Sequence, residues 1–345
     1  MVGPAELARR VGGAITHDLS SLPILALNVH SACNCRCVMC DIWKANSEKR
    51  ELSDEELAGH VADMVRLHVR RVMLTGGEPL LHRNLWALCG RLRRSHIRVT
   101  LVTTGLLAEM QAADIARSVD TVVISLDGPS EVHDAIRRVK GGFEKIARGV
   151  TALRAQVTPP RLIARSVVQR ENYAVIDQTM AAARRVGFDE LSFLAADVSS
   201  AAFNRAEPWS AERRAEVAVP AAELDALSRA ISRALAADHT LFSSGFVVGG
   251  RESLQRVHDY YRAVAGRGAF PDVRCNAPWV SAVLEPGGTL RPCFFHGAYE
   301  SGHATLAASL NSTSAITFRR SLDVKTDPTC RQCVCSLHLP LTQAV

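Results

Sequence analysis

The chain has 345 residues, of which 47% are hydrophobic and 22% charged, which excludes a disordered protein and allows one large domain with an appendage or two ordinary domains. No apolar run approaches the roughly 18 residues of a membrane span, and residues 1–22 lack the apolar core of a secretory signal, so we expect a cytoplasmic protein without a membrane span. The formal net charge is +6, but the basic residues are scattered, and we expect no nucleic-acid partner.

Residues 1–22 are interpreted as an N-terminal extension, after which short apolar runs alternate with amphipathic stretches as far as residue 194. The apolar runs predict strands. These strands cover residues 24–30, 71–75, 98–103, 121–127, 161–168 and 190–194. The amphipathic stretches predict helices at residues 54–67, 84–94, 108–118, 143–155 and 173–186. Ser53 and Glu56 form a capping box at the start of the first helix.

Six strands that alternate with helices predict an α/β fold in which right-handed crossovers wrap a parallel sheet into a partial (β/α)6 TIM-like barrel over residues 23–194. Functional side chains of such a barrel lie at the carboxyl ends of its strands. Residues 195–270 read as a helical bridge that lines the substrate. Its polar candidates for substrate contact, each of which could equally lie on a solvated helix face, are Asn204, Arg205, Arg251, His258, Tyr260 and Tyr261.

Residues 271–345 predict a small domain built from a β-hairpin and helix. Two strand-like runs, 279–284 and 289–295, are joined by the turn Glu285-Pro286-Gly287-Gly288.

Nine of the ten cysteines fall into two groups, at residues 33–40 and 275–335. In a chain without a secretory signal this indicates metal ligation in a reducing compartment, not disulfides. Cys33, Cys37 and Cys40 follow the first predicted strand. Three thiolates can hold three irons of a cubane cluster and leave the fourth iron open to a small ligand. The alternatives are a zinc knuckle or three buried thiols without metal.

The loop Cys33-Asn34-Cys35-Arg36-Cys37-Val38-Met39-Cys40 resembles the signature of the radical S-adenosylmethionine (SAM) superfamily. The resemblance implies a catalytic [4Fe–4S] cluster on Cys33, Cys37 and Cys40, with SAM on the open iron. It also implies one-electron cleavage of SAM to a 5′-deoxyadenosyl radical that removes a hydrogen atom from substrate. One departure is Met39, where many members carry an aromatic residue, and Trp43 is a candidate for nearby stacking instead.

The same resemblance implies a SAM site on the later strand ends. Its predicted residues are Gly76, Gly77, Glu78, Thr103, Ser125, Asp127, Arg165 and Asn172. The two glycines let the backbone approach a ligand, and Glu78 is expected to pair with the SAM amino group. Each position also has a local interpretation, because Ser, Thr, Asp, Asn and Gly are the usual residues of turns and caps.

Cys275, Cys293, Cys330 and Cys333, with Gly288-x4-Cys293 inside the hairpin, resemble the SPASM or twitch extension of radical SAM enzymes. This implies one auxiliary [4Fe–4S] cluster with four thiolates. Cys335 could replace Cys330 or Cys333 as a ligand, and structural zinc is the alternative metal. Cys35 and Cys89 are interpreted as bystanders.

A cluster with every iron blocked is expected to carry electrons, which favours a radical SAM oxidoreductase that oxidises a small-molecule biosynthetic intermediate. One alternative is a maturase that crosslinks or epimerises a ribosomal peptide, aided by a separate leader-binding partner because only about 22 residues precede the first strand. Another alternative is a non-catalytic metal-binding scaffold. An electron donor such as flavodoxin or ferredoxin is implied, and no catalytic side chain is assigned.

Overall fold

The computed structural model describes residues 1–300 and 305–345. Its centre is a sheet in which the six predicted strands are all parallel, in the order β6-β5-β4-β3-β2-β1. The strands are β1 (Ile24–His30), β2 (Arg71–Gly76), β3 (Arg98–Thr103), β4 (Thr121–Ser125), β5 (Arg161–Val168) and β6 (Glu190–Ala195). The predicted partial barrel is therefore confirmed.

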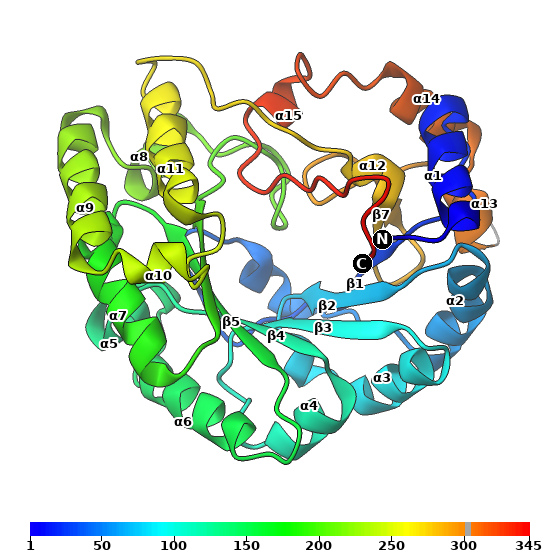
Figure 1. Ribbon diagram of the computed structural model, residues 1–345, viewed down its shortest axis with the longest axis horizontal. Coiled ribbons are helices and arrows are strands. Elements are labelled where there is room, and N and C mark those ends of the chain that lie inside the picture. The colour runs from blue at the N-terminus through cyan, green and yellow to red at the C-terminus, as the bar shows by residue number, and fades with distance from the viewer. Residues whose placement is uncertain (301–304) are drawn as a thin grey trace.

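Helices cover the outer face of this curved sheet, as Figure 1 shows. They are α2 (Asp54–Arg66), α3 (Leu85–Arg94), α4 (Ala112–Ser118), α5 (Ser130–Arg137), α6 (Gly142–Arg154) and α7 (Ile176–Val186). Burial alternates along the strands. On β5, Leu162 and Ala164 are fully buried, whereas Ile163 and Arg165, one position further along in each case, are only half-buried. The period of two thus places one set of side chains in the core and leaves the other set on the concave face.

The predicted hairpin is present as β7 (Ser281–Leu284) and β8 (Leu290–Arg291), and it extends the sheet of the barrel. β7 runs parallel to β1, with Ile24 opposite Ser281 and Leu27 opposite Leu284. The turn of the hairpin is anchored to the start of α2, since the Gly287 backbone N–H donates to Glu56 Oε1 at 2.8 Å.

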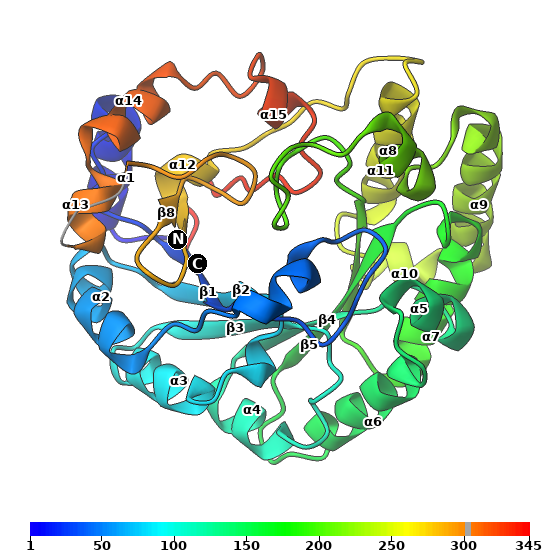
Figure 2. The same cartoon turned by 180° about the vertical axis from the view of Figure 1, so that it is seen from behind.

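The bridge contains α8 (Ala211–Val217), α9 (Leu224–Ala237), α10 (Thr240–Ser243) and α11 (Gly250–Val264). The C-terminal segment adds α12 (Ala277–Val280), α13 (Leu306–Leu310), α14 (Thr313–Ser321) and α15 (Pro328–Arg331). In Figures 1 and 2 they continue the ring of helices from the two ends of the sheet, with α9 next to α7 and α13 next to α2. Among the described residues, no helix is long and apolar enough to cross a membrane.

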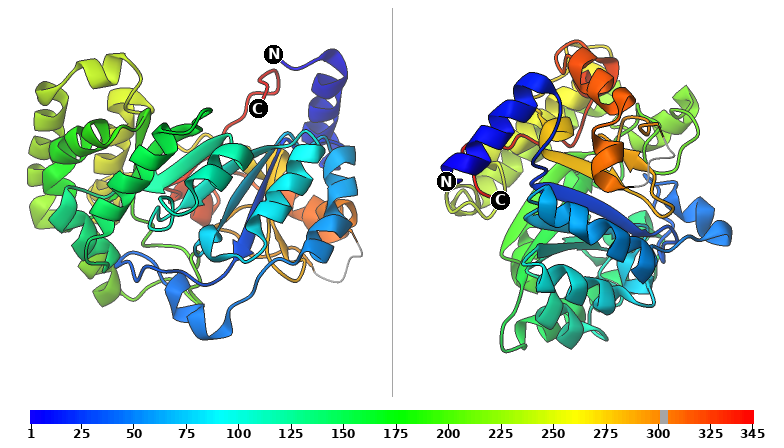
Figure 3. Two further views of the ribbon diagram at one scale, coloured as in Figure 1. Left: turned by 90° about the horizontal axis from the view of Figure 1, so that it is seen from below. Right: turned by 90° about the vertical axis from the view of Figure 1, so that its right-hand side faces the viewer.

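Residues 1–22, predicted only as an extension, contain a helix, α1 (Pro4–Thr16). Its buried Arg10 donates to the carbonyl oxygen of Gln343 at 2.7 Å, and the Val2 N–H donates to the carbonyl of Thr342 at 3.0 Å. The two ends of the chain therefore lie together, on the side of the molecule opposite the segment that follows the cysteine loop (Figure 3).

Candidate metal and cofactor site

The first cysteine group lies on the loop after β1, at the carboxyl ends of the strands. Its backbone is held by two neighbouring segments. The N–H groups of Arg36 and Val38 donate to the carbonyls that end α5, at 3.3 and 3.1 Å. From the short 3-10 helix η1 (Ile42–Glu48), Asn46 exchanges two hydrogen bonds of 2.9 Å with the backbone of Cys33. These contacts fix the backbone of the loop from both sides.

The three predicted ligands differ in their surroundings. A hydrogen bond from Cys35 and the charge of Arg137 lower the pKa of Cys37 to about 6, against the effect of burial. Burial raises the pKa of Cys40 to about 12. A cation at the loop would deprotonate both thiols, since metal coordination outweighs such shifts.

The Gly76-Gly77 turn after β2 packs directly on the cysteine loop. The Gly77 N–H donates to the His30 carbonyl at 2.7 Å, and a Cβ on Gly77 would lie 2.2 Å from the carbonyl oxygen of Ala32. On Gly76, whose φ is +124°, a Cβ would lie 2.4 Å from the His30 carbonyl oxygen. Only glycine allows this approach, so the two loops form one surface.

Glu78 is fully buried, and its carboxylate is surrounded by donors from the protein. It accepts from Leu80 N at 2.9 Å, Thr103 Oγ1 at 2.7 Å and Thr104 N at 2.6 Å. Burial raises the pKa of this carboxyl despite those hydrogen bonds. The predicted residues Glu78 and Thr103 are therefore brought together, and the carboxylate ties the end of β2 to the end of β3.

Ser125 and Arg165 are also brought together, because they are register partners on β4 and β5. Ser192 on β6 continues the row, and Arg165 Nε donates to its Oγ at 3.3 Å. Ser125 and Arg165 are half-buried on the concave face. This row offers hydroxyl groups and a guanidinium to a ligand held at the barrel mouth.

Asp127, in contrast, is fully buried and forms an ion pair with a residue that contacts the cysteine loop. Its Oδ2 accepts from Arg137 Nε at 2.6 Å, and its Oδ1 accepts from the Val167 N–H at 2.9 Å. Arg137 Nη1 in turn lies 3.5 Å from Cys37 Sγ. Sequence reasoning missed Arg137, because α5 buries His133 and Arg137 beside Ile136 and so lacks an apolar pattern.

Asn172 lies next to this pair and is likewise used by the protein. Its Nδ2 donates to the carbonyls of Asp127 and Val167 at 2.8 and 3.1 Å, and its Oδ1 accepts from Gln169 N at 2.7 Å. All polar atoms of the Asn172 side chain are therefore used within the protein. They bond back into the turn after β5, and Asn172 makes no side-chain hydrogen bond that caps the following helix, so its role as a cap was wrong.

The second cysteine group gathers around the hairpin and α15. Burial raises the pKa of Cys333, and the nearby thiols of Cys335, Cys275 and Cys293 add to the effect. His296 Nε2 lies 3.3 Å from Cys330 Sγ. All five C-terminal cysteines thus lie in one region, and Cys335 is among them.

The spacing of the potential ligand atoms bears on which metal would fit. Among the described residues, His296, Asp327 and Cys330 are the one trio of potential ligands whose atoms all lie within 4.8 Å of one another. An imidazole nitrogen, a carboxylate oxygen and a thiolate are all ligands that zinc accepts. The C-terminal region therefore holds a compact ligand set for a single ion beside its cysteines.

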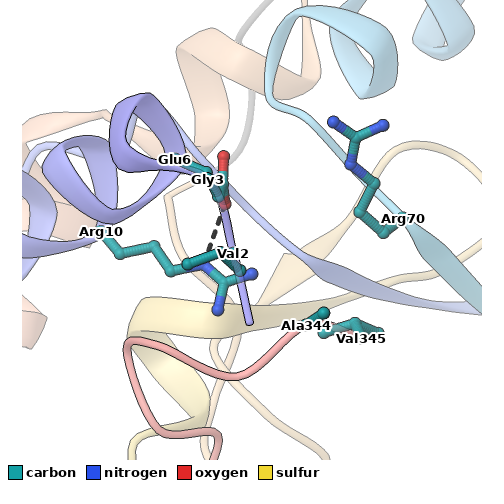
Figure 4. A pocket seen from close by; sticks show the side chains of 7 residues that line it. All are labelled: Val2, Gly3, Glu6, Arg10, Arg70, Ala344 and Val345. Carbon is teal, nitrogen blue, oxygen red and sulfur yellow. Dashed lines mark hydrogen bonds and ion pairs between the residues drawn. The ribbon is translucent and has the colours of Figure 1, made fainter.

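A cavity of about 200 Å³ lies away from both groups (Figure 4). It is lined by Glu6 and Arg10 of α1, by Arg70 just before β2, and by both chain ends. Because Arg70 precedes its strand, this cavity is at the amino ends of the strands, where barrel enzymes do not place their chemistry.

Residues 27–183 match the model of the radical SAM superfamily. They contain the three-cysteine loop, the Gly76-Gly77 turn and the Ser125–Arg165 row described above. Residues 27–183 of this chain belong to the radical SAM superfamily.

Two curated relatives illustrate the range of this radical SAM domain. Mycofactocin maturase MftC of Mycolicibacterium smegmatis is 33% identical over 160 residues, which are 45% of this chain and 40% of MftC. Fe-coproporphyrin III synthase of Methanosarcina barkeri is 30% identical over 131 residues, 37% of this chain and 33% of the relative. The chain therefore spans less than half the length of either relative.

The fold likeness reaches further along the chain. SuiB of Streptococcus suis, solved with S-adenosylmethionine, superposes with a TM-score of 0.60 at 14% identity, covering 96% of this chain and 76% of SuiB. At that identity the match shows a shared fold alone, but it includes the hairpin and the C-terminal segment.

Proposed function

We propose that this protein is a radical SAM enzyme that cleaves SAM reductively and removes a hydrogen atom from its substrate. Cys33, Cys37 and Cys40 would hold a [4Fe–4S] cluster, which supplies the electron for breaking the C5′–S bond of bound SAM. The observation that carries the proposal is the glycine-only contact between the three-thiol loop and the Gly76-Gly77 turn, which puts three soft ligands beside an accessible stretch of backbone.

The chain's own groups would bind and orient SAM. Arg165 is the proposed partner of the SAM carboxylate, because it is half-buried and its neighbour Ser192 occupies only Nε. Ser125 beside it would accept or donate to the ribose or the carboxylate. Gly76 and Gly77 would present backbone, with Glu78 and Thr103 supporting that turn from behind. Asp127 and Asn172 are proposed to act as supports of the strand ends.

We further propose one auxiliary [4Fe–4S] cluster in the C-terminal group. Cys275, Cys293, Cys330 and Cys333 are the proposed ligands, and Cys335 is the reserve. The alternative at this site is a single zinc ion, for which His296, Asp327 and Cys330 lie within 4.8 Å of one another. The proposed task of the auxiliary cluster is to accept the electron left on the substrate radical, with a flavodoxin or ferredoxin supplying electrons to the first cluster.

The substrate class has two candidates, both consistent with net oxidation. Similarity to Fe-coproporphyrin III synthase supports a small-molecule intermediate, which we favour. Similarity to mycofactocin maturase MftC, and to SuiB solved with its precursor peptide SuiA, supports the peptide-maturase alternative. The neighbouring genes would indicate which substrates to try: a short precursor peptide, or the small-molecule intermediates that neighbouring enzymes make. Product formation from one of these and not from the other would separate the two candidates.

The first test uses single substitutions within the cysteine loop. Reconstituted Cys33→Ala, Cys37→Ala and Cys40→Ala should each lose 5′-deoxyadenosine production, because two thiolates cannot fix the cluster with its open iron. Cys35→Ala is the matched control from the same loop, and it should retain the cluster and SAM cleavage. Full 5′-deoxyadenosine formation by any of the first three variants would contradict the proposal.

A further inference from the structure

A buried arginine of the bridge lies against the cysteine loop. The Arg205 side chain is 1% exposed and forms an ion pair of 2.7 Å with Asp197, which is 2% exposed. Its Nη2 also donates to the carbonyl oxygen of Met39 at 3.4 Å. Met39 lies between Cys37 and Cys40, the second and third proposed ligands, so this guanidinium reaches the ligating turn itself.

An indole completes the contact from the next turn of the bridge. Trp209 Nε1 donates to Asp41 Oδ2 at 2.7 Å, immediately after Cys40. The Arg205 guanidinium lies 3.7 Å from the centre of the Trp209 ring. A cation stacked on an indole away from water is attracted more strongly than an exposed one, so Arg205 and Trp209 fix each other.

A second arginine closes the arrangement. Arg213, near the start of α8, lies 4.7 Å from the centre of the Trp209 ring and donates through Nη2 to the Val38 carbonyl. The carbonyls of Val38 and Met39, both between Cys37 and Cys40, are therefore held by guanidinium groups that come from the bridge. The barrel itself supplies neither group.

We propose that Arg205, Trp209 and Arg213 form a clamp that holds the Cys37–Cys40 turn in its ligating conformation. They are positioning residues, since they act on the backbone and on Asp41 and touch no thiol. The clamp rests on the proposed cluster site and deepens it: the segment that would line the substrate also fixes the cluster loop. Arg205 is thereby assigned to the cluster loop and withdrawn from the substrate contacts that its polar character suggested.

The test is the stability of the first cluster in the full-length reconstituted protein. The protein is exposed to an iron chelator, and samples are reduced and measured by EPR over time. The quantity followed is the part of the EPR signal that changes when SAM is added, because this part reports the first cluster. Trp209→Phe keeps the aromatic ring and removes the hydrogen bond to Asp41. It should lose that signal about tenfold faster than the wild type. A factor of ten corresponds to about 1.4 kcal/mol, near the lower end of what a hydrogen bond to a charged group contributes. Arg213→Gln, from a partly exposed position, should also accelerate the loss.

The matched control is Trp279→Phe, which removes an indole hydrogen bond of 3.1 Å to His17 far from the cysteine loop. It should lose the signal at the wild-type rate. The melting temperature of the apo-protein should fall no further in Trp209→Phe than in Trp279→Phe, because each removes one indole hydrogen bond. Wild-type rates in Trp209→Phe and Arg213→Gln would overturn the clamp while leaving the proposed function intact. A wild-type protein with no SAM-responsive signal would overturn the proposed function, and the clamp with it.

Discussion

Asp127 and Asn172 lie side by side at the ends of β4 and β5, and the polar atoms of both side chains form hydrogen bonds within the protein. Their residue types suit ligand binding and turn formation equally, so the sequence alone could not separate the two roles. The three cysteines are different, because their spacing within a single loop already limits the chemistry. Arg137 could not be predicted at all, since its role depends on a helix that brings it to Cys37.

The buried pair of Asp127 and Arg137 gives a prediction for stability. Arg137→Met should lower the free energy of unfolding of the apo-protein by about 3–5 kcal/mol, because it leaves a buried carboxylate without its partner. The double variant with Asp127→Asn removes both charges and should be more stable than the sum of the single effects by about 1–3 kcal/mol. Urea unfolding measures all three, and additive effects would show that the pair is not coupled.

His133 gives a prediction for pH dependence. Burial lowers the pKa of this imidazole to about 4, and its Nδ1 accepts from the Asp127 N–H at 3.2 Å. The unfolded chain therefore binds the proton more readily than the folded protein. The stabilising contribution of neutral His133 is present above pH 6.5 and is lost as the pH falls through 4, by up to about 3 kcal/mol.

His133→Asn is the reference for that experiment, since an amide oxygen can accept from the same N–H without titrating. The stability advantage of the wild type over His133→Asn at pH 7.5 should shrink toward pH 4 in urea unfolding of the apo-proteins. A constant difference over this pH range would mean that His133 does not titrate as its burial implies.

At the scale of elements, the strands were predicted well, and the first, third and fifth have the predicted bounds. β-branched runs between turn residues identify buried parallel strands with little ambiguity. The amphipathic helices were also found, together with the capping box of Ser53 and Glu56. α5 and α8 were missed because they are short and polar, and they form where the cysteine loop and the clamp need partners.

The contact between the Gly76-Gly77 turn and the cysteine loop can be tested with an element-scale pair of substitutions. Gly77→Ala places a Cβ 2.2 Å from the carbonyl oxygen of Ala32, so the loops must separate. It should cost about 1–3 kcal/mol of stability and reduce the iron content after reconstitution. Gly59→Ala is the control: nothing lies within 4 Å of its Cβ in α2, and it should stabilise by about 0.5–1 kcal/mol. Equal iron content in both variants would contradict the packing argument.

For the whole molecule, the sequence predicted the hairpin but could not predict its place in the sheet. Parallel pairing of β7 with β1 joins residues more than 250 positions apart, and no local pattern records such a register. The result is a C-terminal cysteine group attached to the strand that leads into the first cysteine loop.

The two cysteine groups predict two metal centres that load independently. The variant with alanine at Cys275, Cys293, Cys330 and Cys333 should contain about half the iron of the wild type. It should still form 5′-deoxyadenosine, because the N-terminal site has its own three thiolates, but it should fail to oxidise substrate. Zinc in the wild type, or unaltered product formation by the variant, would contradict the electron-carrier role. Metal analysis and product assays on the same preparations measure both outcomes.

The pairing of β7 with β1 also limits how such a protein can diversify during evolution. A C-terminal segment that contributes a strand to the barrel cannot be exchanged for an unrelated module without exposing the edge of β1. The region from α9 to α11 adds no strand to the sheet. It meets the sheet through the bridge between Leu191 and Val247 and through the packing of α11 on β6, and side-chain substitution can adjust such contacts more readily than strand pairing. We therefore expect substitutions that change specificity to accumulate in the region from α9 to α11. The barrel and the C-terminal segment are expected to vary less, because the pairing of β7 with β1 links them.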